Sequence, residues 1–215
     1  MNYLAHLLLS GDDPDCQVGG LLGDFVKGPL RGELPAPIEA GIRLHRAIDS
    51  QTTQIPAIRR LYPLFERPWR RYAGIIIDIA FDHFLAKNWQ HYHRLPLDHF
   101  CTDFYRHLAS QQVLLPPGAL LFSKRAPEIG WLESYADATV MATVLQRVGS
   151  RLSKPVELGR SWQYVEVHQA CFARAFAETM TELNRLAACF LTRENLPLSY
   201  AQSKDFETAK KGKIA

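Results

Sequence analysis

The sequence predicts an all-α protein, and three observations support that prediction. First, it contains no sustained alternation of apolar and polar residues and no Asn-Gly or Asp-Gly turn between β-branched runs, which strands and hairpins would require. Second, apolar residues recur every three or four positions, as in Leu97, Phe100, Phe104 and Leu108. Third, prolines divide the chain into segments of helical length. We therefore expect a single-domain helical bundle over residues 1–200, with about eight to ten helices.

Five helices are expected in the first 92 residues, because each has an apolar face and a boundary marked by proline, glycine or threonine. The second should stop near Gly28 and Pro29, since glycine followed by proline ends a helix. The expected ranges are 3–9, about 16–26, a third from the Pro35 and Pro37 pair through Asp49, 52 to about 66, and 68 to about 92.

The second half of the chain should be helical as well. A helix over 97–113 follows from its apolar spacing, and Pro116 with Pro117 opens a shorter one. Two or three further helices are expected over 131–152 and 156–191. Residues 203–215 are mostly polar, and we expect them to form a disordered tail.

The sequence favours a cytoplasmic protein with reduced cysteines. The apolar start MNYLAHLLL has no basic residue before it and meets Asp12 and Asp13 soon after, unlike a signal peptide. No run approaches the roughly 18 to 20 uncharged residues of a spanning helix. The four cysteines form no CxxC pair, which favours reduced thiols. The expectation is a cytoplasmic protein without a membrane partner.

Charge is unevenly distributed. The net charge is +3, but residues 25–71 contain nine Lys or Arg and four acids, a net +5 that leaves −2 for the rest. A total of +3 is too small to predict a nucleic-acid partner. The basic segment has two interpretations: solvated helix faces, or a surface that attracts a phosphate or an acidic partner.

The segment GIIIDIAFDHFL, residues 74–85, places Asp78, Asp82 and His83 among isoleucines and phenylalanines. An ionised carboxylate buried without a partner costs several kcal/mol, so these acids require water, a cation or a metal. In a helix, residues four apart share a face, whereas His83 lies about 100° away from Asp82. Two carboxylates can therefore face one centre, with His83 at the edge.

Similar polar residues interrupt other apolar segments. His45 and Asp49 are four apart in GIRLHRAID, Asp24 lies in VGGLLGDFVKG, and His6 lies in NYLAHLLL. Each alone could be a core histidine or an acid paired with arginine. Together they form a set of carboxylates and imidazoles, the ligands of Mn, Fe, Zn or Mg, within the first 85 residues. A divalent metal is the partner that this set predicts.

The arginines near these acids have two possible roles. Arg46, Arg70 and Arg71 could neutralise Asp49 or Asp78 in a structural network, or bind a substrate phosphate with the guanidinium fork. The sequence lacks a Walker loop, a GxGxxG motif, HExxH and a GxSxG elbow, so common nucleotide and hydrolase motifs do not explain it.

Four motifs in order, MNYLAHLLLS, GGLLGDFVKG, GIRLHRAID and RPWRRYAGIIIDIAFDHFLAKNW, resemble the acyl-carrier-protein phosphodiesterases. The resemblance covers the first 90 residues closely and extends more loosely to about residue 190. It implies an all-helical, HD-domain-like protein that uses a divalent metal, preferably manganese. It also implies cleavage of 4′-phosphopantetheine from holo acyl carrier protein, which leaves the apo carrier.

The family motifs contain Asp24, His45, Asp49, Asp78, Asp82 and His83, so the resemblance implies that these residues form the catalytic site. Two departures are present: the adjacent pair reads Asp then His, the reverse of ordinary HD proteins, and Leu8 stands where the family has a second histidine. We predict metal ligation by Asp24, His45, Asp78 and either Asp82 or His83, with His6 a further candidate.

Two alternatives remain beside this interpretation. One is an HD-type phosphohydrolase that acts on a nucleotide or a small phosphoester and needs no protein partner. The other is a metal-free helical binding protein, in which the arginines neutralise the acids. If the substrate is an acyl carrier protein, which is acidic, the +5 segment would favour encounter with it. The sequence predicts no oligomeric state.

Overall fold

The computed structural model describes residues 1–203 and contains no strand in that range. Ten α-helices and six short 3-10 helices lie between residues 3 and 193, and residues 200–203 are helical as well, which confirms the all-α prediction. Of the predicted tail, only Ser203 lies within the described residues. The assignment of residues 1–200 to one domain stays a prediction. None of the described helices is long and apolar enough to cross a membrane.

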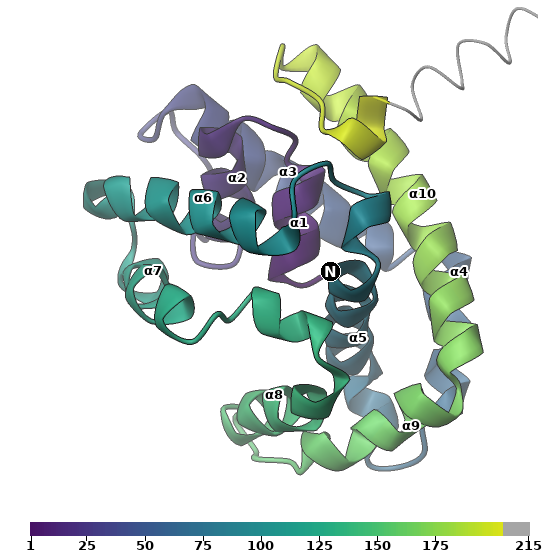
Figure 1. Cartoon of the computed structure of the whole chain (residues 1–215). Helices are drawn as coiled ribbons and strands as arrows, with labels where there is room; N and C mark the ends of the chain where they lie inside the picture. The colour runs from purple at the N-terminus through teal and green to yellow at the C-terminus, as the bar shows by residue number, and fades with distance from the viewer. Residues whose placement is uncertain (204–215) are drawn as a thin grey trace, which may run out of the picture.

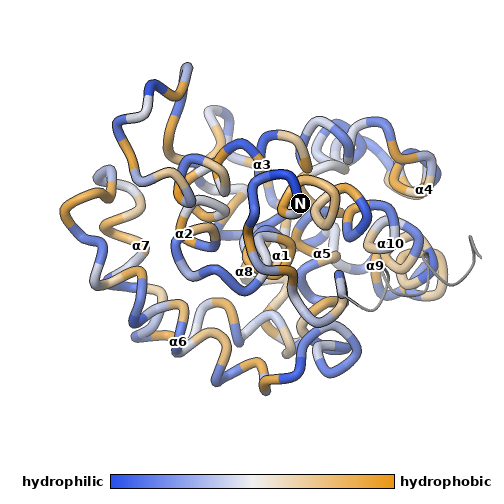
Figure 2. Tube along the Cα trace, turned by 90° about the horizontal axis from the view of Figure 1, so that it is seen from above, coloured by the Kyte–Doolittle hydropathy of each residue, from blue (hydrophilic) through white to orange (hydrophobic). Residues whose placement is uncertain are grey.

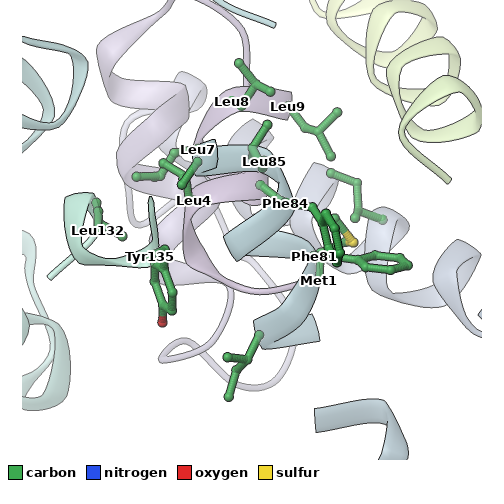
Figure 3. Close-up of a cluster of buried hydrophobic side chains, with 14 of the residues drawn as sticks. Met1, Leu4, Leu7, Leu8, Leu9, Phe81, Phe84, Leu85, Leu132 and Tyr135 are labelled. Carbon is green, nitrogen blue, oxygen red and sulfur yellow. The ribbon is translucent and has the colours of Figure 1, made fainter. Parts of the chain in front are cut away.

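Two helices form the centre of the molecule: α1 (Tyr3–Leu9) and α5 (Ala73–Lys87). Figure 1 shows them in the middle of the bundle, with the long helix α10 (Gln169–Arg193) along one side. Leu4, Leu7, Phe81 and Leu85 are fully buried and belong to one hydrophobic cluster (Figure 3). Because α5 is apolar nearly all round, it is buried on most sides, as expected for a central helix.

Helices α2 (Pro14–Leu22) and α3 (Ala36–Thr52) approach each other unusually closely. A Cβ atom on Gly19 would lie 2.1 Å from the Ile38 carbonyl oxygen, and one on Gly41 would lie 2.1 Å from that of Cys16. Only glycine therefore permits this crossing at either position. The consequence is that the end of α2 lies against the middle of α3.

The remaining α-helices surround this centre. In order they are α4 (Pro56–Arg59), α6 (Leu97–Ser110), α7 (Pro117–Glu128), α8 (Ala138–Ser150) and α9 (Trp162–Val167). Hydrophobic and hydrophilic residues alternate along α6 and α7 in Figure 2, as expected for helices with one face toward the core.

Several predicted boundaries are wrong, among them that of the helix expected over 97–113, which is α6 ending at Ser110 followed by the 3-10 turn Gln112–Leu114. Helix α2 ends at Leu22 and not near Val26, because residues 23–25 form a turn, in which the N–H groups of Phe25 and Val26 both donate to the Leu22 carbonyl. The predicted helix 52–66 is a short α4 and a 3-10 turn, since Pro56 starts a new helix. The predicted helix 68–92 is α5 flanked by two 3-10 turns, Trp69–Tyr72 and Trp89–His91.

Candidate metal centre

Three side chains from α1 and α3 converge at one point. The candidate ligand atoms of His6, His45 and Asp49 all lie within 4.8 Å of one another. His6 Nε2 is 3.1 Å from Asp49 Oδ1, and His45 Nε2 is 3.2 Å from Asp49 Oδ2. The two imidazole rings stack with their centroids 3.7 Å apart. One carboxylate and two imidazoles thus surround a common space, which is the usual ligand chemistry of a transition-metal ion.

The tautomer of His45 decides what this space can accept. His45 Nδ1 is 2.7 Å from the Gly20 carbonyl oxygen and therefore donates its hydrogen there. In the neutral ring, Nε2 then presents a lone pair toward Asp49 and toward Asp24, whose Oδ1 is 3.8 Å away. A lone pair facing two carboxylates is stable only if a proton or a cation lies between them. Fixing the tautomer through the other ring nitrogen is also how metal-binding histidines are held.

Two further carboxylates flank the group. The side chains of Asp24 and Asp78 are 46% and 38% exposed, so both remain in contact with solvent. The Met1 amino nitrogen lies 3.2 Å from Asp78 Oδ1 and 3.5 Å from Asp49 Oδ1. Three acids are therefore gathered around the two histidines, and a positive group already lies among them.

The pKa values of the site carboxylates and of His6 are shifted in different directions. Burial raises the pKa of Asp24 and of Asp78, and nearby Asp49 raises both further. Burial would also raise the pKa of Asp49, but its contacts with the His45 and His6 rings and the nearby Met1 amino group hold the pKa well below its usual value. Burial lowers the pKa of His6 to about 3, so its ring is neutral. A neutral imidazole and an ionised carboxylate are the forms that bind a metal.

Asp82 makes different contacts, although it shares a face of α5 with Asp78. Its two carboxylate oxygens accept hydrogen bonds from the backbone N–H groups of Leu4 (2.9 Å) and Ala5 (3.0 Å). Asp82 is fully buried, and burial raises its pKa to about 7. Asn2, which precedes α1, provides no side-chain cap. Asp82 therefore satisfies the first turn of α1 and ties that helix to α5.

His83 lies in another environment. Its Nδ1 is 2.8 Å from the Tyr135 carbonyl oxygen, and its ring meets Trp162 edge to face at 5.4 Å. Burial lowers its pKa. The roughly 100° between consecutive helix positions turns His83 toward the segment Glu133–Ala136 and α9. The structure thus does not bring His83 into the group formed by His6, His45 and Asp49.

The three predicted phosphate-binding arginines are also separated. Arg46 lines a cavity of about 340 Å³ beside the candidate ligands, together with Asp24, His45 and Asp49. Arg70 instead donates to the Phe65 carbonyl (2.8 Å), and the Arg71 guanidinium lies 4.9 Å from the centre of the Tyr72 ring. Within residues 1–203, none of the three forms an ion pair with the site carboxylates.

Two residues of this site were not among the site residues predicted from the sequence. Lys27 lines the same cavity, and its sequence signals were its positions in the basic segment and in the motif GGLLGDFVKG. Gly23 allows the His45 ring to approach, because a Cβ there would lie 2.2 Å from His45 Cγ. No sequence pattern distinguishes Gly23 from its neighbours Gly19 and Gly20, since its role depends on a contact with another helix.

Comparisons with known proteins concern the family of the whole chain. A family model for acyl carrier protein phosphodiesterase matches residues 1–183. An acyl carrier protein phosphodiesterase from Yersinia pestis is 36% identical over 179 residues, covering 78% of this chain and 88% of the relative. Those from Photorhabdus laumondii and Klebsiella pneumoniae are 34% and 32% identical, covering 82% and 87% of this chain and 89% and 97% of the relative. No solved structure matches the chain. The chain belongs to the acyl carrier protein phosphodiesterase family.

Proposed function

We propose that this protein removes 4′-phosphopantetheine from holo acyl carrier protein. Water is added across the phosphodiester, the bond between phosphorus and the carrier serine oxygen breaks, and the phosphate leaves with the pantetheine. The observation that carries the proposal is the convergence of His6, His45 and Asp49 beside a cavity that also holds Arg46 and Lys27. Membership of the family identifies the reaction class, and this geometry provides the groups that the reaction needs.

The proposed cofactor is one or more divalent cations, with manganese first and magnesium, iron or zinc as alternatives. The donor set fits at His45, whose lone pair points at two carboxylates. His6 is neutral, and its Nε2, which is 3.2 Å from the Met1 carbonyl oxygen, would present a lone pair to the ion in the other tautomer. His6, His45 and Asp49 would hold the ion, with Asp24 and Asp78 as further ligands. A bound divalent cation lowers the pKa of a coordinated water toward neutrality and polarises a phosphoryl oxygen.

The side chains around the cavity have separate tasks in this proposal. Asp49 contacts both imidazoles and holds their orientation. Asp24 is half exposed at the cavity, so as a further ligand it would lie on the side of the site that is open to substrate. Arg46 and Lys27 would neutralise the phosphate oxygens. Arg70 and Arg71 point to other partners and are not assigned to the phosphate.

We assign Asp82 and His83 supporting positions. Asp82 fixes α1, and so places His6, through its hydrogen bonds to Leu4 and Ala5. His83 supports the segment that contains Tyr135. This differs from the ligand roles expected from the sequence, and metal binding by variants of each residue tests the difference. The HD-like assignment of the fold likewise stays a proposal.

The test is mass spectrometry of holo carrier after incubation with the protein and manganese. We expect the carrier to lose the mass of phosphopantetheine, and a chelator to prevent the loss. Asp49→Asn should abolish it, whereas Asp98→Asn, at an exposed position on α6, should not. An unchanged carrier mass together with rapid hydrolysis of a nucleotide would favour the phosphohydrolase alternative. Absence of bound metal and of any hydrolysis would favour the metal-free binding protein.

A further inference from the structure

We propose that the loop apex Lys27–Arg31, together with Arg46, is the surface on which the acidic carrier protein docks. This inference rests on the proposed function, because it names where the macromolecular substrate would contact the chain. Lys27 and Arg46 also face the phosphate in that proposal, whereas Arg31 does not line the cavity and the reaction at phosphorus does not require it. Four steps support it: the partners of the other basic residues, the anchoring of the loop, its position beside the cavity, and its local charge.

Five of the nine Lys and Arg residues in the segment 25–71 fall into two groups with different partners. Arg43 pairs with Glu194 at 2.9 Å, and Arg60 pairs with Glu178, both acids being on or beside α10. Arg59 donates to the Thr53 carbonyl oxygen at 2.9 Å. These three cations are therefore occupied by contacts within the chain. Lys27 and Arg31 are exposed, and neither has an acidic partner within ion-pair distance among residues 1–203.

The loop is fixed at both ends and open in the middle. At its start, the Val26 carbonyl accepts from Arg46 at 2.9 Å. At its end, the N–H of Gly32 donates to the buried carboxylate of Glu39 at 2.8 Å. Gly28 and Gly32 adopt positive φ angles, and a Cβ on either would meet no atom within 4 Å. The apex is thus held in place by hydrogen bonds while its surroundings remain open to a partner.

The apex also forms one edge of the active-site cavity. Lys27 and Gly28 line the cavity that contains Asp24, His45 and Asp49. A protein resting on the apex would therefore bring a phosphodiester on its own surface to the candidate metal ligands. Basic groups at this edge would accelerate encounter with an acidic protein and orient it, more than they would add affinity.

One acid near the apex, Glu33, reduces the local positive charge. Reversing its charge therefore tests the proposal in the opposite direction to reversing that of Arg31. Glu33 is exposed, lies two residues after Arg31, and has no cationic partner within ion-pair distance among the described residues. If the apex attracts an acidic protein, Glu33 weakens the attraction. Reversing Arg31 and reversing Glu33 should then change carrier turnover in opposite directions.

The experiment measures kcat/KM for holo carrier with manganese at several ionic strengths. At low salt we expect Arg31→Glu to lose about tenfold and Glu33→Lys to gain severalfold, within the range of electrostatic steering effects. Both differences should shrink above about 0.5 M salt, where the screening length is only a few ångströms. The matched control is Arg185→Glu, an equal charge change at an exposed position of α10, which should leave kcat/KM unchanged.

A small diester, bis(p-nitrophenyl) phosphate, separates docking from chemistry. Its hydrolysis should be the same in the wild type, Arg31→Glu and Glu33→Lys, since neither residue lines the cavity. Equal losses on both substrates, or no change with carrier, would overturn the docking proposal while the proposed function stands. A wild type that hydrolyses the small diester but never the carrier would refute the proposed function itself, and the docking proposal with it.

Discussion

Asp78 and Asp82 lie one turn apart on the same face of α5, yet the structure gives them opposite environments. Asp78 is 38% exposed and lies 3.2 Å from the Met1 amino nitrogen, next to the candidate metal ligands. Asp82 is fully buried and accepts two backbone hydrogen bonds from the first turn of α1. Helical spacing set the shared face, but the position of α1 decided which acid meets the site and which meets a helix end.

The largest expected effect is at the candidate metal ligands, which lie next to the partly exposed Asp78. Asp49→Asn should reduce kcat by about 10³-fold, because removing a ligand or charged partner at a reaction centre costs several kcal/mol of transition-state stabilisation. Isothermal titration with manganese should show weaker binding than in the wild type. If Asp82→Asn weakened manganese binding as much as Asp49→Asn does, Asp82 would belong to the metal site and its supporting role would be wrong.

A second variant changes ligand position without removing a ligand. In Gly23→Ala, the new methyl group would meet the His45 ring at 2.2 to 2.6 Å, so the ring must move. We expect a loss of about 10²-fold in kcat, since displacing a catalytic group by about 1 Å can have that effect. The control is Gly74→Ala on α5, where the nearest atom is the Tyr62 hydroxyl at 3.2 Å. Equal activity in both variants would contradict the proposed position of His45.

For Asp82, the buried residue of the pair, the expected effect is on stability. Asp82→Ala leaves the N–H groups of Leu4 and Ala5 without acceptors, which should lower the free energy of unfolding by about 2 to 4 kcal/mol. Asp137→Ala, which removes an exposed cap from α8, should cost only about 1 kcal/mol. Urea denaturation measures both. A smaller loss for Asp82→Ala than for Asp137→Ala would show that Asp82 does not anchor α1.

The raised pKa of Asp82 predicts that the free energy of unfolding depends on pH. The pKa of Asp82 is about 7 in the folded protein, above its usual value of 3.8, so the folded state holds this proton more tightly. Its contribution to stability is complete below pH 3.8 and is lost as the pH rises toward 7. The free energy of unfolding of the wild type, relative to Asp82→Asn, should therefore fall between pH 4 and pH 7. A flat difference would indicate an ordinary pKa.

The smallest effect is expected at the neighbouring position. His83→Gln removes the imidazole that lies 2.8 Å from the Tyr135 carbonyl, which should cost about 1 kcal/mol of stability. Manganese affinity should equal that of the wild type, because the ring lies against Trp162 and not among the ligands. Loss of metal binding in His83→Gln with a normal unfolding transition would restore the ligand role expected from the sequence.

Much of this molecule could be predicted from its sequence, and the failures have identifiable causes. Periodicity and prolines were sufficient for the all-α fold and for the range of α1. The polar residues isolated in apolar segments included all three members of the converging group, His6, His45 and Asp49. The end of α2 was placed too late, because the apolar pattern does not distinguish the turn over residues 23–25 from a last turn of helix.

The sequence by itself determined which residues are chemically unusual: acids and histidines in segments that otherwise belong in a core. Only the tertiary structure decided their partners. Asp82 is not among the converging group because α1 presents two unpaired N–H groups to it, and His83 is turned away by the helical step. Lys27 and Gly23 became significant because α2 crosses α3 at glycines. Periodicity fixes the direction of a side chain along its own helix, whereas the atoms that it meets come from segments distant in the sequence.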